Sequence, residues 1–213
     1  MKSAVRLIKV TKSFQKEQVL KGITHSFEQG KIHGITGFNG SGKTVMFKCI
    51  CGFLKPDSGT VFVQGQQIGR DADFPRSVGM IIENPGFLPH LSGFANLKRL
   101  AAIQRKITDE QIRKSIARAG LDPFSRKKVG QYSLGMRERL GIAQAIMEEP
   151  KLLVLDEPFN GLDKRGARDV CNLLDELRSR GRTILIAAHN ILEIEYLCDT
   201  ICEMEAGTLT QLK

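Results

Sequence analysis

The sequence has no apolar run close to the roughly 20 residues that a helix needs to cross a bilayer. Residues 1–6 are too few and too charged to begin a signal peptide. We therefore expect a protein that stays in the cytoplasm and does not itself span a membrane.

The signals of a disulfide-bonded or multi-domain protein are also missing. The number of cysteines is odd, and no disulfide framework fits their positions: Cys49, Cys51, Cys171, Cys198 and Cys202. We expect free, reduced thiols, because buried unpaired cysteine is more common than a cysteine metal site. The chain shows no repeat, low-complexity tract or linker, so its 213 residues predict one substantial core.

Positive charge is in excess and unevenly placed. The formal net charge is +9, and residues 86–148 hold 12 Lys and Arg against 5 Asp and Glu. Such an excess could face a nucleotide, a nucleic acid or an anionic membrane surface, or it could lie on solvated helix faces. Charge alone does not choose among these surfaces.

Short apolar strands alternate with helices along most of the chain. Apolar patterns predict strands at 4–10, 31–36, 60–63, 78–82, 152–155, 183–187 and 200–204. Helical spacing predicts helices at 45–50, 91–106, 108–119, 133–148 and from Asp163 onward. This alternation is typical of an α/β domain whose mostly parallel sheet has helices on both sides. We expect a single domain, 1–213, in which a helical subdomain, 86–148, is inserted between core segments 1–85 and 149–213.

A glycine-rich loop lies between the strand predicted at 31–36 and the helix predicted at 45–50. Gly37-x-x-x-x-Gly42-Lys43-Thr44 fits the phosphate-loop pattern in the right context. Its glycines let backbone N–H groups surround a β-phosphate, and the helix N-terminus adds partial positive charge. Lys43 would hold the β- and γ-phosphates, and Thr44 would bind Mg²⁺. The predicted phosphate-binding residues are Gly37, Phe38, Asn39, Gly40, Ser41, Gly42, Lys43, Thr44 and Val45.

Two carboxylates follow the apolar strand at 152–155. Asp156 emerges at the carboxyl end of that strand, where ligands bind in parallel sheets, and could hold Mg²⁺ through water. Glu157 follows and could orient or deprotonate an attacking water. Asp156-Glu157-Pro158 alone could be an ordinary strand exit, but together with Lys43 it predicts a phosphoryl-transfer site.

His189 follows the apolar strand at 183–187. A single histidine after a strand is more often structural than catalytic. Here it would be the third strand end at the same edge of the sheet, so we expect its imidazole to contact a γ-phosphate and to stabilise transferred charge.

The segment Tyr132-Ser133-Leu134-Gly135-Met136 makes the order of these motifs specific. With it, the chain resembles the ATP-binding subunit of ABC transporters over essentially its whole length. The resemblance implies a P-loop NTPase core with an antiparallel strand subdomain. It identifies 132–136 as the family's signature segment, Asn160-Gly161-Leu162-Asp163 as its Asp-loop and His189 as its switch histidine. It also implies that Phe14 stacks on adenine.

The same resemblance implies how the motifs work together. Two subunits would form a head-to-tail dimer in which Ser133 and Gly135 of one close over ATP held by Lys43 of the other, with Asp163 beside the nucleotide. The cofactors would be ATP and Mg²⁺, and the catalytic residues Lys43, Glu157 and His189. Such a subunit hydrolyses ATP to drive export through separate transmembrane permease subunits. It would lie on the inner face of the membrane, with no stable nucleic-acid partner.

Three positions depart from the family's usual pattern. Leu134 replaces the first signature glycine, and Met136 replaces glutamine, so a side-chain hydrogen bond from position 136 to the partner's nucleotide is lost. Glu83 stands where the family usually has glutamine. These residues resemble the branch that handles bacitracin and lantibiotic-type peptides. We expect Glu83 to lie beside Mg²⁺ and to couple Mg·ATP to the membrane partner through the loop 84–96.

Two other functions fit parts of the sequence. An ABC-type ATPase acting on nucleic acid or ribosomes would use the basic excess in 86–148, although such proteins often carry two ATPase units or long coiled-coil insertions. A phosphate-loop kinase would use the Lys43 loop. The signature segment, the Asp-loop and the histidine, which follow one another in this chain, argue against a kinase.

Overall fold

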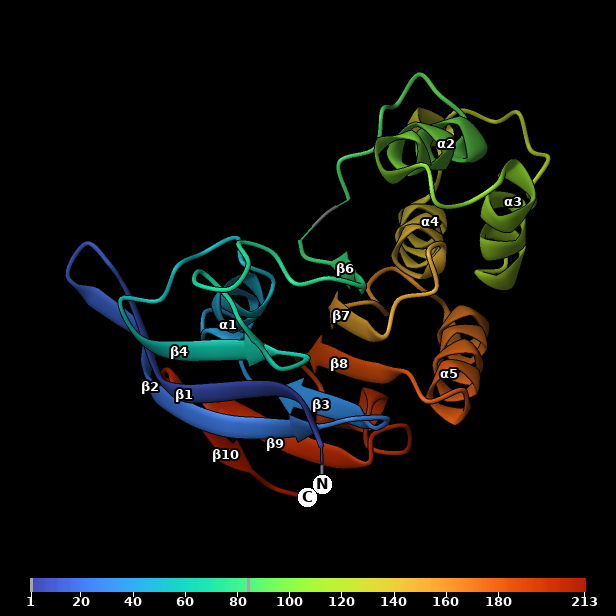
Figure 1. Cartoon of the computed structure of the whole chain (residues 1–213). Helices are drawn as coiled ribbons and strands as arrows, with labels where there is room; N and C mark the ends of the chain where they lie inside the picture. Colours follow the sequence, from blue (N-terminus) through green and yellow to red (C-terminus); the bar gives the residue numbers. More distant parts are fainter. Residues whose placement is uncertain (1, 84) are drawn as a thin grey trace.

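The strands with continuous apolar character lie side by side in one sheet of the computed structural model, which describes residues 2–83 and 85–213 (Figure 1). Asn84, in the loop expected to couple to a partner, lies outside the described residues. The strand order is β10-β9-β3-β8-β7-β6. Its members are β3 (Ile32–Thr36), β6 (Val78–Ile81), β7 (Leu152–Asp156), β8 (Thr183–Ala188), β9 (Thr200–Glu205) and β10 (Thr208–Gln211). Neighbouring strands from β9 to β6 are parallel, whereas β10 is antiparallel to β9.

A second, antiparallel sheet has the order β2-β1-β4-β5. It contains β1 (Ser3–Phe14), β2 (Glu17–Glu28), β4 (Ser58–Val63) and β5 (Gln66–Gln67). The apolar pattern predicts only 4–10 of β1 and none of β2. Both strands pair through register shifts, and Lys9 has a φ of 48°, so that the alternation of buried and exposed residues is interrupted.

The mostly parallel sheet has an apolar core on each face. In β7, Leu153 and Leu155 pack among the helices α4 (Leu134–Ile146) and α5 (Lys164–Ser179). Leu152 and Val154 point the other way and pack with α1 (Lys43–Ile50) and the antiparallel sheet. Because β7 is buried on both sides, its sequence is a continuous apolar run, and each buried leucine contributes about 1.5–3 kcal/mol to stability.

Three helices form a lobe beside the sheet, at the upper right of Figure 1. They are α2 (Gly93–Gln104), α3 (Asp109–Arg118) and α4, and short 3₁₀ helices lie at Val129–Gln131 and Ile191–Glu193. Ser92, Thr108 and Ser133 cap α2, α3 and α4 through their side-chain oxygens. The expected division at 85/86 and 148/149 stays a prediction. Within the described chain, no helix has both the length and the apolar character needed to cross a membrane.

Glu138 is a carboxylic acid on the buried face of α4, where it is only 5% exposed. Burial raises its pKa from 4.5 to about 7. As pH rises from 4.5 to 7, the unfolded chain loses this proton before the folded protein does. The free energy of unfolding therefore falls as pH rises through this range. Above it, Glu138 is ionised in both states, and the folded protein bears the full cost of the buried charge.

We predict that Glu138→Gln increases the free energy of unfolding at pH 8 by about 1–3 kcal/mol more than at pH 5, because glutamine removes the cost of a buried charge. Urea unfolding at the two pH values measures the difference. Glu203→Gln, at an exposed position of β9, is the matched control and should show no such difference. Equal stabilisation at both pH values would show that Glu138 is not titrating between them.

Candidate active site

Parallel pairing brings the predicted motifs to one edge of the sheet. Thr36, which leads into the glycine-rich loop, pairs with Ala188, and Asp156 pairs with Ala187. The loop, the two carboxylates and His189 therefore begin at neighbouring strand ends, as expected. Ligands bind at this edge of parallel sheets, because the loops that leave it surround a common space.

The glycine-rich loop ends at Gly42, the N-cap of α1, with a φ of 113°. A side chain there would be strained, and its Cβ would lie 3.1 Å from the Val19 carbonyl oxygen and the Leu20 side chain. Lys43 begins the helix and is 5% exposed. Its Nζ donates to the carbonyl oxygens of Gly37 and Phe38 at 2.5 and 3.1 Å. The loop thus holds one buried ammonium at its centre, where phosphate oxygens are the natural partners.

Thr44 and Asp156 provide oxygen atoms of the kind that Mg²⁺ prefers. The Thr44 hydroxyl donates to Asp156 Oδ2 at 2.6 Å. Asp156 Oδ1 is buried, and among residues 2–83 and 85–213 it has no hydrogen-bond partner. Burial raises the pKa of Asp156, with a further contribution from Glu157, while the Thr44 hydrogen bond and Lys43 oppose the increase. A buried carboxylate with an unpaired oxygen beside a hydroxyl fits a hard divalent cation.

Glu157 and His189 form the other wall of the site. His189 Nδ1 lies 2.8 Å from Glu157 Oε2. Glu157 has a φ of 53°, a conformation that is strained for a residue with a side chain. Its backbone N–H donates to the Ala187 carbonyl at 2.9 Å, and its own carbonyl accepts from Asn160 N at 3.1 Å. Hydrogen bonds on both sides therefore hold the strained turn that directs the carboxylate toward His189.

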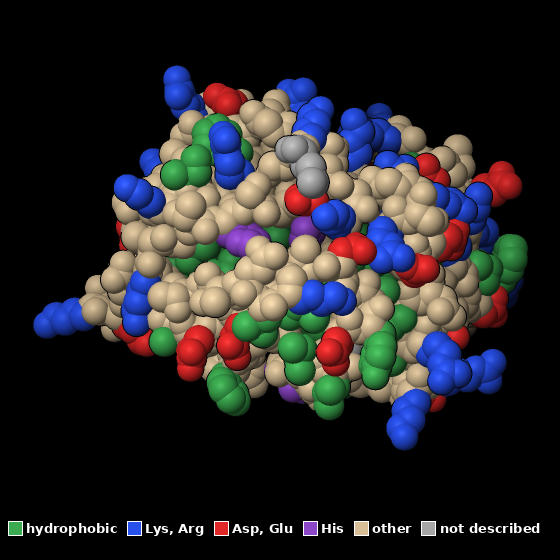
Figure 2. Space-filling model, turned by 90° about the horizontal axis from the view of Figure 1, so that it is seen from below, with side chains coloured by type: hydrophobic (Ala, Val, Ile, Leu, Met, Phe, Trp, Pro, Cys, Tyr) green, Lys and Arg blue, Asp and Glu red, His purple; other side chains and the backbone are tan. Residues whose placement is uncertain are grey.

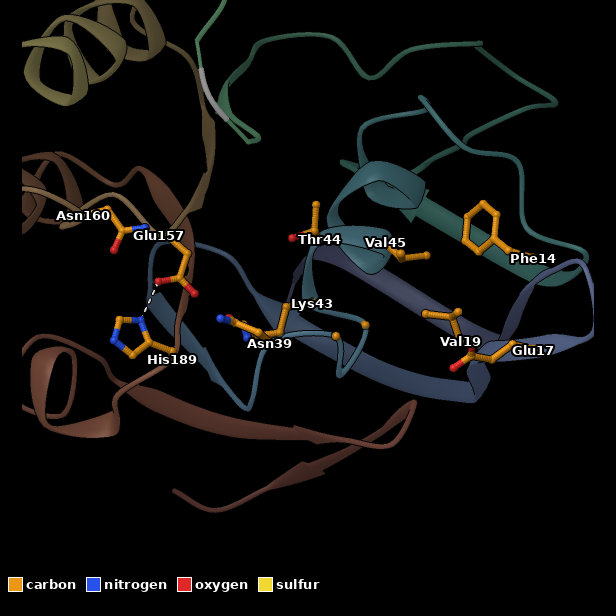
Figure 3. A pocket seen from close by; sticks show the side chains of 12 residues that line it. Phe14, Glu17, Val19, Asn39, Lys43, Thr44, Val45, Glu157, Asn160 and His189 are labelled. Carbon is orange, nitrogen blue, oxygen red and sulfur yellow. Dashed lines mark hydrogen bonds and ion pairs between the residues drawn. The ribbon is translucent and has the colours of Figure 1, made fainter. Parts of the chain in front are cut away.

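Lys43, Thr44, Glu157 and His189 line a cavity of about 620 Å³ (Figure 3). Glu157, Asn160 and His189 lie on one side, and Phe14 and Val45 lie beyond Lys43 on the other. Phe14 is 44% exposed, as a ring that receives a ligand must be. The sequence-predicted residues that line this cavity are Phe14, Asn39, Gly40, Gly42, Lys43, Thr44, Val45, Glu157 and His189.

Glu17, Val19 and Asn160 also line the cavity but were not among the predicted ligands. Glu17 and Val19 lie on β2, whose interrupted pattern hides the strand, so no signal in the sequence identifies them. Asn160 could have been predicted to line the cavity from its position in the Asp-loop segment.

Gly37, Phe38 and Ser41 belong to the loop around Lys43, and Asp156 accepts a hydrogen bond from Thr44. The predicted signature and Asp-loop residues lie elsewhere. Ser133, Gly135 and Asp163 line a second cavity, of about 390 Å³, together with Met136, Arg139, Gly161 and others. Ser133 Oγ accepts from Met136 N at 3.2 Å, so it caps its own helix, and Asp163 Oδ1 caps α5 by accepting from Gly166 N at 2.7 Å. Within one chain, the signature segment therefore does not reach the phosphate loop.

Glu83 follows β6 at the same edge of the sheet, but its side chain has another partner. Its Oε1 pairs with Lys48 Nζ on α1 at 2.6 Å, and its carboxyl side chain is 63% exposed. The backbone of Glu83 slightly opposes the increase that burial causes in the pKa of Asp156. The structure thus shows an ion pair at Glu83 and no contact of its carboxylate with Thr44 or Asp156.

Sequence comparison identifies relatives over nearly the whole chain. The model of the ABC transporter family matches residues 20–160. The uncharacterized ABC transporter ATP-binding protein YybJ of Bacillus subtilis is 43% identical over 205 residues, which cover 96% of this chain and 94% of YybJ. The bacitracin transport ATP-binding protein BcrA of Enterococcus faecalis is 38% identical over 213 residues, covering 99% of this chain and 69% of BcrA.

Structural comparison gives the same fold. A dimeric ATP-binding cassette, MJ0796, whose structure holds ADP and Pi, superposes with a TM-score of 0.88 over 98% of this chain and 99% of that one, at 22% identity. The predicted fold class is therefore confirmed. With the family match and the relatives that cover the whole fold, the chain belongs to the ABC transporter family as one of its ATP-binding subunits, an ATP hydrolase.

Proposed function

We propose that this ATPase drives export of a peptide antibiotic through transmembrane permease subunits at the inner face of the membrane. The observation that carries the proposal is the cavity in which Lys43, Thr44, Glu157 and His189 converge opposite Phe14. The substrate class follows from the resemblance to the bacitracin and lantibiotic branch and from the similarity to BcrA, which is named for bacitracin transport.

Each residue has a role that follows from its position. Lys43 binds the β- and γ-phosphates from the centre of the loop, and Phe14 stacks on adenine. Thr44 and Asp156 hold Mg²⁺, which when bound neutralises developing phosphate charge. Glu157 accepts the proton of the attacking water, and His189, hydrogen-bonded to it, faces the γ-phosphate.

The second cavity completes this site in a dimer. Ser133 is the N-cap of α4 and lines the second cavity, so its hydroxyl and the N-terminal N–H groups of that helix can donate to an anion bound there. We infer that the anion is the γ-phosphate held by Lys43 of a second copy or a related subunit. The dimeric state of the MJ0796 cassette supports this arrangement.

A surface beside Glu83 suits the membrane partner. Lys48, which pairs with Glu83, lies near the end of α1, and its carbonyl accepts from Phe53 N at 2.9 Å. Phe53 and Phe74 are 52% and 58% exposed, and their ring centroids lie 6.0 Å apart. Exposed aromatic side chains at the end of the helix that begins in the phosphate loop could accept an apolar segment of the permease. The Glu83–Lys48 pair would then transmit its position to the nucleotide.

The comparisons do not support action on nucleic acid. On the face shown in Figure 2, Lys and Arg side chains are dispersed and interleaved with Asp and Glu rather than gathered in one patch. A nucleic-acid site needs a continuous basic footprint.

Glu157→Gln should leave ATP affinity within about threefold of the unchanged protein and lower turnover by at least about 10²-fold, because the amide keeps the size of the side chain but cannot accept the proton. Equilibrium nucleotide binding and phosphate release measure the two quantities. Glu205→Gln, on an exposed position of β9, is the control. Hydrolysis at the normal rate would show that another group is the base.

Phe14→Ala should weaken ATP binding about tenfold, since stacking of a base on an aromatic ring contributes on the order of 1–3 kcal/mol. Phe14→Tyr should retain the affinity. Titration with a fluorescent ATP analogue measures both. Phe53→Ala removes an exposed ring outside the cavity and should leave affinity unchanged. A normal affinity of Phe14→Ala would assign adenine recognition to other residues.

Glu83→Gln should lower partner-stimulated ATP hydrolysis and transport several-fold, because glutamine cannot form the ion pair with Lys48. Lys48→Gln breaks the same pair and should have a similar effect. Both variants are assayed with the co-purified membrane subunits in vesicles, and ATP affinity is measured separately. Wild-type stimulation and transport in both variants would rule out coupling through this ion pair.

A further inference from the structure

Leu134, the residue in place of the first signature glycine, packs against a segment of its own chain. It is the first residue of α4 and is 51% exposed. Its side chain covers Gly161: a Cβ built on Gly161 would lie 2.5 Å from Leu134 Cγ and Cδ2 and 3.0 Å from its Cβ. Leu134 therefore occupies the space into which any side chain at position 161 would project.

Gly135, the neighbouring signature residue, lies against the same segment. A Cβ on Gly135 would lie 2.7 Å from the Gly161 carbonyl oxygen and 3.4 Å from the Leu162 side chain. Gly161 has a φ of +70°, which glycine adopts readily. The two segments thus fit together because residues 135 and 161 lack side chains and Leu134 fills the remaining space.

Gly161 lies in a short turn between the two cavities. Asn160 lines the nucleotide cavity, and Gly161, Leu162 and Asp163 line the second. The turn is tied to the catalytic strand end, since Asn160 N donates to the Glu157 carbonyl at 3.1 Å. It is tied to α5 through the Asp163 cap. A shift at Gly161 must therefore move Asn160 and the hydrogen bond that holds the strained Glu157 turn.

We propose that Leu134 is a positioning residue for hydrolysis. By packing over Gly161 it fixes the turn 157–163. This one contact within the subunit thereby fixes the position of the Glu157 carboxylate relative to the N-terminus of α4, where the signature segment lies. This inference rests on the proposed roles of Glu157 and Ser133. It also explains why leucine stands at position 134 in place of the family's usual glycine. The leucine side chain fills the space next to residue 161, which leaves room only for glycine there.

The test is a double-mutant cycle of Gly161→Ala, Leu134→Gly and the double variant in the full chain. Gly161→Ala should lower kcat at least tenfold with ATP affinity within about threefold, because the new methyl group displaces the turn while the phosphate loop is untouched. Leu134→Gly should lower kcat several-fold by releasing the turn. The double variant should hydrolyse ATP at least fivefold faster than Gly161→Ala, since the clash is gone.

Gly65→Ala is the matched control for backbone strain. Gly65 has a φ of +84°, and a Cβ there would meet nothing within 4 Å. Gly65→Ala should leave kcat unchanged. The backbone strain of alanine at position 161 cancels in the double-mutant cycle, because Gly161→Ala and the double variant both carry it. Leu212→Gly, at a leucine that is 53% exposed, controls for loss of an exposed side chain. Additive changes in log kcat, or a loss of ATP affinity that equals the loss of kcat, would overturn the proposal.

Two further measurements keep the result decisive. If Gly161→Ala does not fold by circular dichroism, the folded yield of the double variant replaces kcat: rescue by Leu134→Gly supports the contact, and its absence overturns it. Glu157→Gln is measured in parallel. Unchanged hydrolysis in Glu157→Gln contradicts the proposed function itself, whereas its loss together with an additive cycle contradicts only the role of Leu134.

Discussion

Parallel pairing of β3 with β8 and of β8 with β7 places Thr36 beside Ala188 and Asp156 beside Ala187, at neighbouring strand ends. The segments that line the nucleotide cavity follow these strand ends, except for the residues that the antiparallel sheet contributes. A slip of one residue in either pairing would reverse the faces of a strand that is buried on both sides. The two apolar cores that clamp the sheet therefore also fix the distances between Lys43, Asp156 and His189.

Within that frame, the site concentrates features that cost stability. Lys43 and Asp156 are buried charged groups, and Glu157 has a left-handed backbone conformation. Lys43 donates to carbonyl oxygens of the loop, Asp156 accepts from Thr44 on α1, and backbone hydrogen bonds hold the turn at Glu157. Such groups are costly in a ligand-free fold and become paired when phosphate and a divalent cation enter, which is why binding sites keep them.

The strongest predictions from the sequence concern elements whose signal is local. The apolar run at 152–155 and the helix expected from Asp163 onward are both confirmed: β7 is buried throughout, and α5 buries Val170, Leu173, Leu174 and Leu177. By contrast, β2 is not predicted, because its bulged pairing with β1 removes the period of two. Glu17 and Val19 were missed for that reason, and the Lys48 partner of Glu83 was missed because an ion pair between a helix and a strand end has no pattern along the chain.

The sequence by itself determined the phosphate loop, the acidic strand end, the signature and their order, and these sufficed to identify the family. Their residue types are dictated by local chemistry, such as glycine where backbone must approach phosphate. Only the tertiary structure decided that Ser133 and Lys43 of one chain lie in different cavities, and that Leu134 packs over Gly161. Those facts depend on how α4 is placed against the segment that follows β7, which is set by packing between residues far apart in the chain.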